Sequence, residues 1–213
     1  MRIDVWFVML PGVLSLDMTG PAETFVLAGD AFRLHYIGPQ PDVPTSIGLT
    51  MSGIQPLPES LSPGSLLVLP GVSDSRFQFS TPQAQQIQHW LMRRQPQLVL
   101  VSIGGNDFLR KVPEADTRSN IRQIVQQIKA AGVPAVLVAV PYFTTGALFG
   151  RLSEHPMYEE LAAELNVPLL KGAWAEVLGD KKLKSDQIHA NAQGYRVFAE
   201  KMWAFLKQQG FAR

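Results

Sequence analysis

The sequence predicts a three-layer α/β/α protein, in which helices cover both faces of a doubly wound, mostly parallel sheet within a single domain over residues 1–213. Three observations lead to this prediction. Short apolar runs rich in Val, Leu and Ile alternate with stretches of helical period. Each apolar run ends near Gly or Pro, which is typical of strands that turn into helices. A chain of 213 residues that is 46% apolar can also bury one sizeable core.

The predicted strands are continuous apolar runs, as expected for parallel strands covered by helices on both faces. They comprise residues 3–10, 33–38, 65–71, 97–105, 135–142 and 167–172. Apolar residues at helical spacing predict helices over residues 81–94, 119–132 and 191–210. The first helix opens on Thr-Pro and the other two close on Gly, which are start and stop signals. Residues 39–64 are dense in Pro, Gly, Ser and Thr and predict a hairpin off the sheet.

Composition excludes several classes of function. Charged residues make up 17% of the chain and the formal net charge is +1, so neither nucleic acid nor a membrane is an expected partner. The absence of cysteine excludes disulfides, thiolate metal sites and a thiol nucleophile. The first apolar run is too short to span a membrane and lacks a cleavage pattern, which favours a cytoplasmic protein.

The expected partner is a small, weakly charged molecule such as an ester, with no cofactor and no metal. Three scattered histidines, His35, His89 and His155, show no ligand spacing. We expect them at the surface or in satisfied hydrogen bonds.

Two motifs carry the residue types of a hydrolytic site. "IGGND" follows the predicted strand 97–105, so the Asn106 amide should project at the carboxyl edge of the sheet and donate to a developing oxyanion, with Gly105 beside it. "SDQIHANAQGY" places Asp186 and His189 three residues apart before a helix. At that spacing a carboxylate can orient an imidazole that acts as a general base.

From residue 97 to the C-terminus the chain resembles the SGNH (GDSL-type) hydrolases, particularly their lysophospholipase/thioesterase-like and arylesterase-like members. "LVLVSIGGND" is similar to the third conserved block of that family and "DQIHAN" to the fifth. The resemblance implies that Asn106 is an oxyanion donor, that His189 is the general base and that Asp186 is its partner.

The first block of that family is a Gly-Asp-Ser-Leu motif after the first strand, and its serine is the nucleophile. This tetrapeptide does not occur in the chain, which reads "LPGVLSLDMTGPAETF" at the corresponding place. Ser15 or Thr19 could reach the site from that segment, and Ser15 is the candidate nucleophile.

Residues 3–95 resemble a different family, the ThiJ/PfpI-type domains of the class I amidotransferase-like fold, especially those that open AraC-type transcription regulators. The similar segments are "VLSLDMTGPAETFVLAG", "GPQPDVPTSIGLTMSGI" and "LSPGSLLVLPGVSDS". This resemblance implies that Glu23 is the acid that supports a nucleophile elbow. The elbow itself is missing, and without cysteine its thiol chemistry cannot operate.

The main hypothesis from the sequence is therefore a chimera, recombined or engineered, of two flavodoxin-like halves over residues 1–96 and 97–213. Its ester-hydrolase site would be incomplete and its activity weak or absent. One alternative is a working SGNH-type carboxylic-ester hydrolase that uses Ser15, with the backbone near Gly12 or Gly71 as oxyanion donor. Another is a small-ligand-binding module derived from a regulator domain, with its ligand near Glu23 and the turn at residues 69–75.

Overall fold

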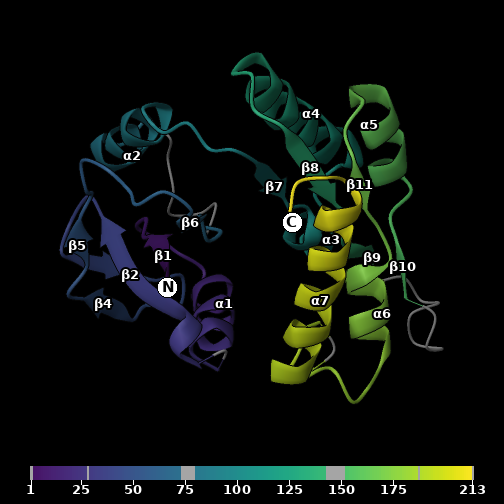
Figure 1. The fold of residues 1–213 in the computed structure, drawn as a ribbon, viewed down its shortest axis with the longest axis horizontal. Helices are drawn as coiled ribbons and strands as arrows, with labels where there is room; N and C mark the ends of the chain where they lie inside the picture. Colours follow the sequence, from purple (N-terminus) through teal and green to yellow (C-terminus); the bar gives the residue numbers. More distant parts are fainter. Residues whose placement is uncertain (1, 28, 73–79, 143–151, 187, 213) are drawn as a thin grey trace. The chain divides into compact units, whose positions relative to one another are not determined.

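The computed structural model describes residues 2–27, 29–72, 80–142, 152–186 and 188–212. The chain divides into two compact units, Met1–Arg94 and Gln95–Arg213, each of which has its own sheet and helices (Figure 1). This boundary lies two residues before the division expected from the sequence, although the assignment of one domain made of these two halves stays a prediction.

The sheet of the first unit is four-stranded and parallel, with the order β5-β2-β1-β6. Its strands are β5 (Gln55–Pro56), β2 (Phe32–Gly38), β1 (Ile3–Val8) and β6 (Leu66–Val68). A separate hairpin of β3 (Asp42–Pro44) and β4 (Thr50–Ser52) is antiparallel, which confirms the hairpin predicted within residues 39–64. A short 3-10 turn, η1 (Gly29–Ala31), precedes β2.

Side chains of β1 point alternately to two helices, because successive residues of a strand face opposite sides of the sheet. Val5 and Phe7 belong to an apolar cluster with Met18 of α1 (Ser15–Leu27). Val8 instead clusters with Ile87 and Trp90 of α2 (Pro82–Met92). The first unit therefore has a sheet between two helical layers.

The sheet of the second unit is parallel and three-stranded, with the order β11-β8-β7. Its strands are β11 (Leu169–Leu170), β8 (Ala135–Val138) and β7 (Val99–Val101). Leu137 of the central strand packs with residues of α4 (Glu114–Ala130) and α5 (Met157–Leu165), whereas Val136 packs with residues of α7 (Ala192–Gln208). The helix α6 (Ala173–Gly179) runs beside α7 (Figure 1).

Both units thus have parallel strands between helices, which confirms the predicted three-layer α/β class. Within the described ranges, no helix is long and apolar enough to cross a membrane.

Five of the six predicted strands are shorter in the structure, all except 33–38, and two of them give way to other elements. The run 97–105 is a strand only as far as Val101, and α3 (Gly105–Leu109) follows because Gly104 has φ +107, a conformation that ends an extended chain. The run 135–142 ends as β8 at Val138. Its last two residues form β9 (Pro141–Tyr142), which pairs antiparallel with β10 (Ser153–Glu154).

We predict that Gly194→Ala destabilises the protein by about 1–3 kcal/mol, the usual cost of inserting a methyl group into a packed site. A Cβ at Gly194, in the first turn of α7, would collide with the backbone carbonyl of Leu183 and press on Ala190 and Val177. Urea unfolding measures the loss.

The matched control is Gly179→Ala at the end of α6, where a Cβ would have no heavy atom within 4 Å. This variant should lie within about 0.5 kcal/mol of the parent protein, as surface substitutions usually do. Equal stabilities for the two variants would contradict the close packing of Gly194 against the Leu183 carbonyl.

Candidate functional site

The loop between α6 and α7 carries the predicted Asp186 and His189, and its two ends are fixed. Lys184 and Ala190 form an antiparallel bridge, and the Ser185 amide donates to the His189 carbonyl at 2.9 Å. Asn191 caps α7, since its Oδ1 accepts from the Gly194 amide at 3.0 Å and its Nδ2 donates to the Lys182 carbonyl at 2.7 Å. Asp186 and His189 therefore lie in a loop whose two ends are hydrogen-bonded to each other.

The Asp186 carboxylate is oriented by the backbone as well as by the imidazole. Its Oδ1 accepts from the amides of Ile188 and His189, both at 2.8 Å, and its Oδ2 lies 2.7 Å from Nδ1 of His189. These hydrogen bonds, that of the imidazole first, hold the pKa of the Asp186 carboxyl below its usual range. The carboxylate is therefore ionised at neutral pH.

This pairing fixes the chemistry that His189 can perform. An ionised carboxylate only accepts hydrogen bonds, so Nδ1 must carry a hydrogen and Nε2 is the nitrogen that can take a proton. The His189 side chain is 33% exposed, which leaves it accessible to a substrate. The structure thus brings together a histidine and an orienting carboxylate, the arrangement of a general base.

Asn106 lies in the same unit, on α3, directly after the carboxyl end of β7. Its side chain is exposed, and Gly105 beside it is the first residue of the helix. Because β7 and β11 both run parallel to β8, their carboxyl ends meet at one edge of the sheet, and α6 starts immediately after β11. The approach of Asn106 to His189 itself stays a prediction.

Ser15, by contrast, belongs to the first unit, where it is the first residue of α1. Its Oγ is buried and has no hydrogen-bond partner in the described part of the chain. The Gly12 amide donates to the Pro44 carbonyl at 2.7 Å, and the Gly71 carbonyl accepts from the Leu14 amide at 2.8 Å. An oxyanion role for Gly12 would require its amide to give up this bond.

The predicted ligand site at Glu23 is only partly described. Glu23 is exposed on α1, close enough to Tyr36 to help burial raise the pKa of that phenol. The turn predicted at residues 69–75 is described only as far as Val72, because residues 73–79 lie outside the described residues. The binding-module reading therefore stays a prediction.

The other histidines lie where the sequence suggested. His35 Nε2 is 2.9 Å from Asp4 Oδ1, His155 Nδ1 accepts from the Met157 amide at 3.2 Å, and His89 is exposed on α2. No group of three or more His, Asp or Glu side chains among the described residues could hold a metal ion.

Comparison with known proteins identifies the family. Residues 62–197 match the model of the GDSL-like Lipase/Acylhydrolase family, and the chain belongs to that family. Thioesterase 1/protease 1/lysophospholipase L1 of Escherichia coli K12 is 35% identical to the chain over 116 residues, 53% of this chain and 54% of that protein. The chain therefore spans about half the length of the curated relative that it matches.

Solved structures extend the likeness in fold to nearly the whole chain. The psychrotrophic esterase EstA of Pseudoalteromonas matches with a TM-score of 0.54 at 13% identity, covering 96% of this chain and 97% of the esterase. A crystal structure of TesA matches with a TM-score of 0.53 at 16% identity, covering 96% and 98%. At these identities the likeness shows the fold alone. Because each match covers 96% of the chain, both parts of the chain belong to one α/β fold.

These comparisons do not support the predicted chimera. The family match begins at residue 62 and runs through the expected seam at residues 96 and 97, and nothing found supports a ThiJ/PfpI-type front half or an engineered origin. The front-half resemblance was built on strand, turn and helix segments. Parallel α/β folds of unrelated families share such segments, because they pack their layers by the same rules. The incomplete, inactive site, which was inferred from the missing Gly-Asp-Ser-Leu tetrapeptide, is not supported by the comparisons either.

We predict that the Asp186 carboxyl titrates below its ordinary value of 3.8 and that its pKa rises in His189→Ala, because the imidazole bond is the largest cause of the shift. A lowered pKa in the folded state means that stability from this carboxylate is present above the unfolded pKa. It is lost as the pH falls through the folded pKa. Carbon-detected NMR titration of the carboxyl groups measures both.

Asp4 is the internal control, since its pKa is lowered by a different histidine, His35. Its titration should be the same in the parent protein and in His189→Ala. An unchanged Asp186 midpoint in that variant would contradict the pairing.

Proposed function

We propose that this protein is a carboxylic-ester hydrolase in which His189 acts as general base, Asp186 orients it and Asn106 donates to the oxyanion. The observation that carries the proposal is the 2.7 Å contact between His189 Nδ1 and a carboxylate that two backbone amides also hold in place. Membership of the GDSL-like Lipase/Acylhydrolase family supports this chemistry over a binding function.

In the proposed reaction, Nε2 of His189 takes a proton from the nucleophile as it attacks the ester carbonyl. Negative charge then develops on the carbonyl oxygen, where the Asn106 amide donates to it. The imidazolium returns the proton to the leaving oxygen or sulfur, and Asp186 stabilises the cation in the meantime. Water releases the acid in a second, equivalent cycle.

Ser15 is the proposed nucleophile. Support comes from its place after the first strand, at the start of α1. Its Oγ is buried, so attack on a substrate requires that this hydroxyl become accessible. The runner-up within the same proposal is a water molecule activated directly by His189.

The substrate class follows from the chemistry and from the relative. The matched Escherichia coli protein carries thioesterase and lysophospholipase in its name. We therefore propose that the substrates are esters or thioesters of carboxylic acids.

We predict that p-nitrophenyl acetate is hydrolysed and that His189→Ala lowers kcat/KM by about 10³-fold or more, as expected when a general base is removed from a unit of this kind. Asn106→Ala should cost about 10²–10³-fold in kcat, the usual effect of one oxyanion donor. Release of p-nitrophenolate measures both.

The control is His89→Ala, which removes an exposed histidine of α2 and should leave the rate unchanged. Full activity in His189→Ala would exclude the proposed general base. No turnover in the parent protein, with either an ester or a thioester, would exclude the proposed function.

A second prediction concerns the nucleophile. A fluorophosphonate probe should label the protein stoichiometrically, and peptide mass mapping should place the adduct on Ser15, because only an activated hydroxyl attacks such a phosphorus centre. Labelling should be lost in Ser15→Ala and retained in Ser52→Ala, which changes an exposed serine of β4. Activity that survives Ser15→Ala without any adduct would assign the attack to water instead.

A further inference from the structure

The helix that carries Asn106 is too short to hold its own position. α3 has five residues, and helices of that length are marginal in water without tertiary contacts. The geometry of an oxyanion donor must nevertheless be kept to within a fraction of an ångström. Contacts with neighbouring elements must therefore fix the position of α3 and of Asn106.

One fully buried side chain contacts the backbone before Asn106 and the side chain after it. The Tyr158 hydroxyl, from α5, donates to the Ile103 carbonyl at 2.7 Å. The same ring meets Phe108 edge to face, with centroids 6.4 Å apart and planes at 85°. Tyr158 thus contacts both sides of Asn106, three residues before it and two after it.

The turn that starts α3 rests directly on this phenol. A Cβ at Gly104 would lie 2.5 Å from the Tyr158 hydroxyl oxygen, closer than any real side chain allows. Gly104 also has φ +107, which L-residues with a side chain rarely adopt. The approach of the backbone to Tyr158 therefore depends on glycine at position 104.

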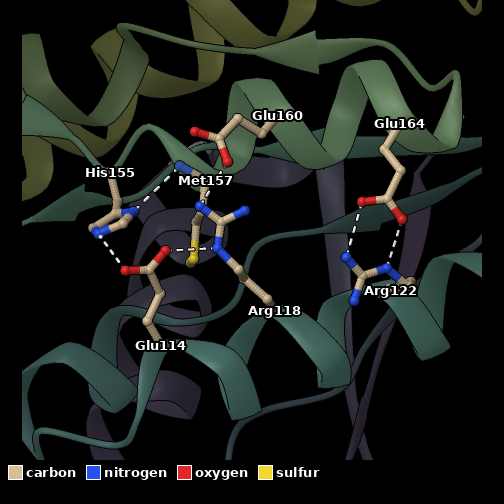
Figure 2. A network of polar contacts seen from close by, with 7 residues as sticks. All are labelled: Glu114, Arg118, Arg122, His155, Met157, Glu160 and Glu164. Carbon is tan, nitrogen blue, oxygen red and sulfur yellow. Dashed lines mark hydrogen bonds and ion pairs between the residues drawn. The ribbon is translucent and has the colours of Figure 1, made fainter.

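The segment that supplies Tyr158 is itself tied to α4. Arg118 lies 2.6 Å from Glu114 of the same helix and 2.7 Å from Glu160 of α5. Arg122 donates two hydrogen bonds to the Glu164 carboxylate, at 2.6 and 2.9 Å, and Figure 2 shows the side chains of this network. The pairs of Arg118 with Glu160 and of Arg122 with Glu164 join α4 to α5, the helix that carries Tyr158.

His155 adds a second contact from this segment to α3. Its Nδ1 accepts from the Met157 amide, its Nε2 lies 3.6 Å from Glu114 (Figure 2), and its ring stacks on Phe108 at 5.2 Å. Phe108 is therefore in contact with two rings, His155 just before α5 and Tyr158 in its first turn.

We propose that Tyr158 is a positioning residue for Asn106, which it fixes through the Ile103 carbonyl and the Phe108 ring. This inference rests on the proposed function, because it assigns Asn106 the oxyanion. Burial raises the pKa of Tyr158, so its hydroxyl keeps its proton and remains a donor. Charge on the oxyanion exists only during the reaction, so a misplaced donor lowers kcat more than it changes KM.

The test is Tyr158→Phe, which keeps the ring and removes the bond to Ile103. We expect kcat to fall by about 10–100-fold and KM to change by less than about two-fold, as for a small displacement of a transition-state donor. In an Asn106→Ala background the same substitution should cost less than about two-fold, since the group that Tyr158 positions is already gone. An equal loss in both backgrounds would overturn the proposal.

The matched control is Tyr36→Phe, which removes a phenol hydroxyl from β2 in the first unit. It should leave kcat unchanged. A comparable loss of kcat in this variant would overturn the assignment, because the effect would then not belong to Tyr158.

Hydrogen exchange provides a readout that does not need turnover. The Phe108 amide donates to the Gly104 carbonyl at 3.1 Å and the Arg110 amide to the Asn106 carbonyl at 2.9 Å. In Tyr158→Phe these two amides should exchange at least about ten-fold faster, while those of Ile121 and Val125 in α4 stay as protected as before. Unchanged exchange in α3, or an equal loss in α4, would overturn the proposal even if the parent protein showed no esterase activity.

Discussion

Burial of strand β8 on both faces is the constraint on which the second unit depends. All four residues of the strand, Ala135–Val138, are buried, and their side chains alternate between two apolar clusters. A strand of this kind cannot face water on either side, so helices must cover both faces. Its parallel neighbours β7 and β11 then end at the same edge, which is where the chain places Asn106 and begins α6.

The candidate site combines this edge with backbone hydrogen bonds rather than with many side-chain contacts. Asp186 is oriented by two amides of its own loop, and α3 is held by a phenol that reaches a main-chain carbonyl. Backbone groups move less than long side chains, so they hold catalytic groups with little loss of conformational entropy. The surrounding helices contribute mainly by packing these loops against the sheet.

Much of this could be predicted from the sequence, because the signals are local. The Asp186–His189 pair followed from a spacing of three residues, and the centres of the strands followed from runs of Val, Leu and Ile. The position at which strand 97–105 gives way to α3 did not, since it depends on Gly104 adopting a positive φ. The contact on which the proposed role of Tyr158 depends could not be predicted either, because its partner Ile103 lies 55 residues away.

In the front half, residues 1–96, local structure was predicted correctly but the family was not. There the local signals were real, since the predicted strands and hairpin exist, but they did not identify a family. Strand, turn and helix segments report how an α/β layer packs, and many families pack alike. Family membership became clear only from a match that crosses residues 96 and 97.

The ion pairs between α4 and α5 have a consequence for ionic strength. Arg118 and Glu160 are 24% and 60% exposed, and Arg122 and Glu164 are 35% and 46% exposed, so dissolved salt can reach both pairs. At about 1 M salt the screening length falls to about 3 Å, which leaves little attraction between such charges. Behind them, Ile121, Val125 and Leu161 are fully buried, and dissolved ions do not screen apolar contacts as they screen charge pairs. At high salt concentration the packing of α5 on α4 would therefore depend on its apolar face. In dilute solution the charges would serve chiefly to select the orientation of the helix.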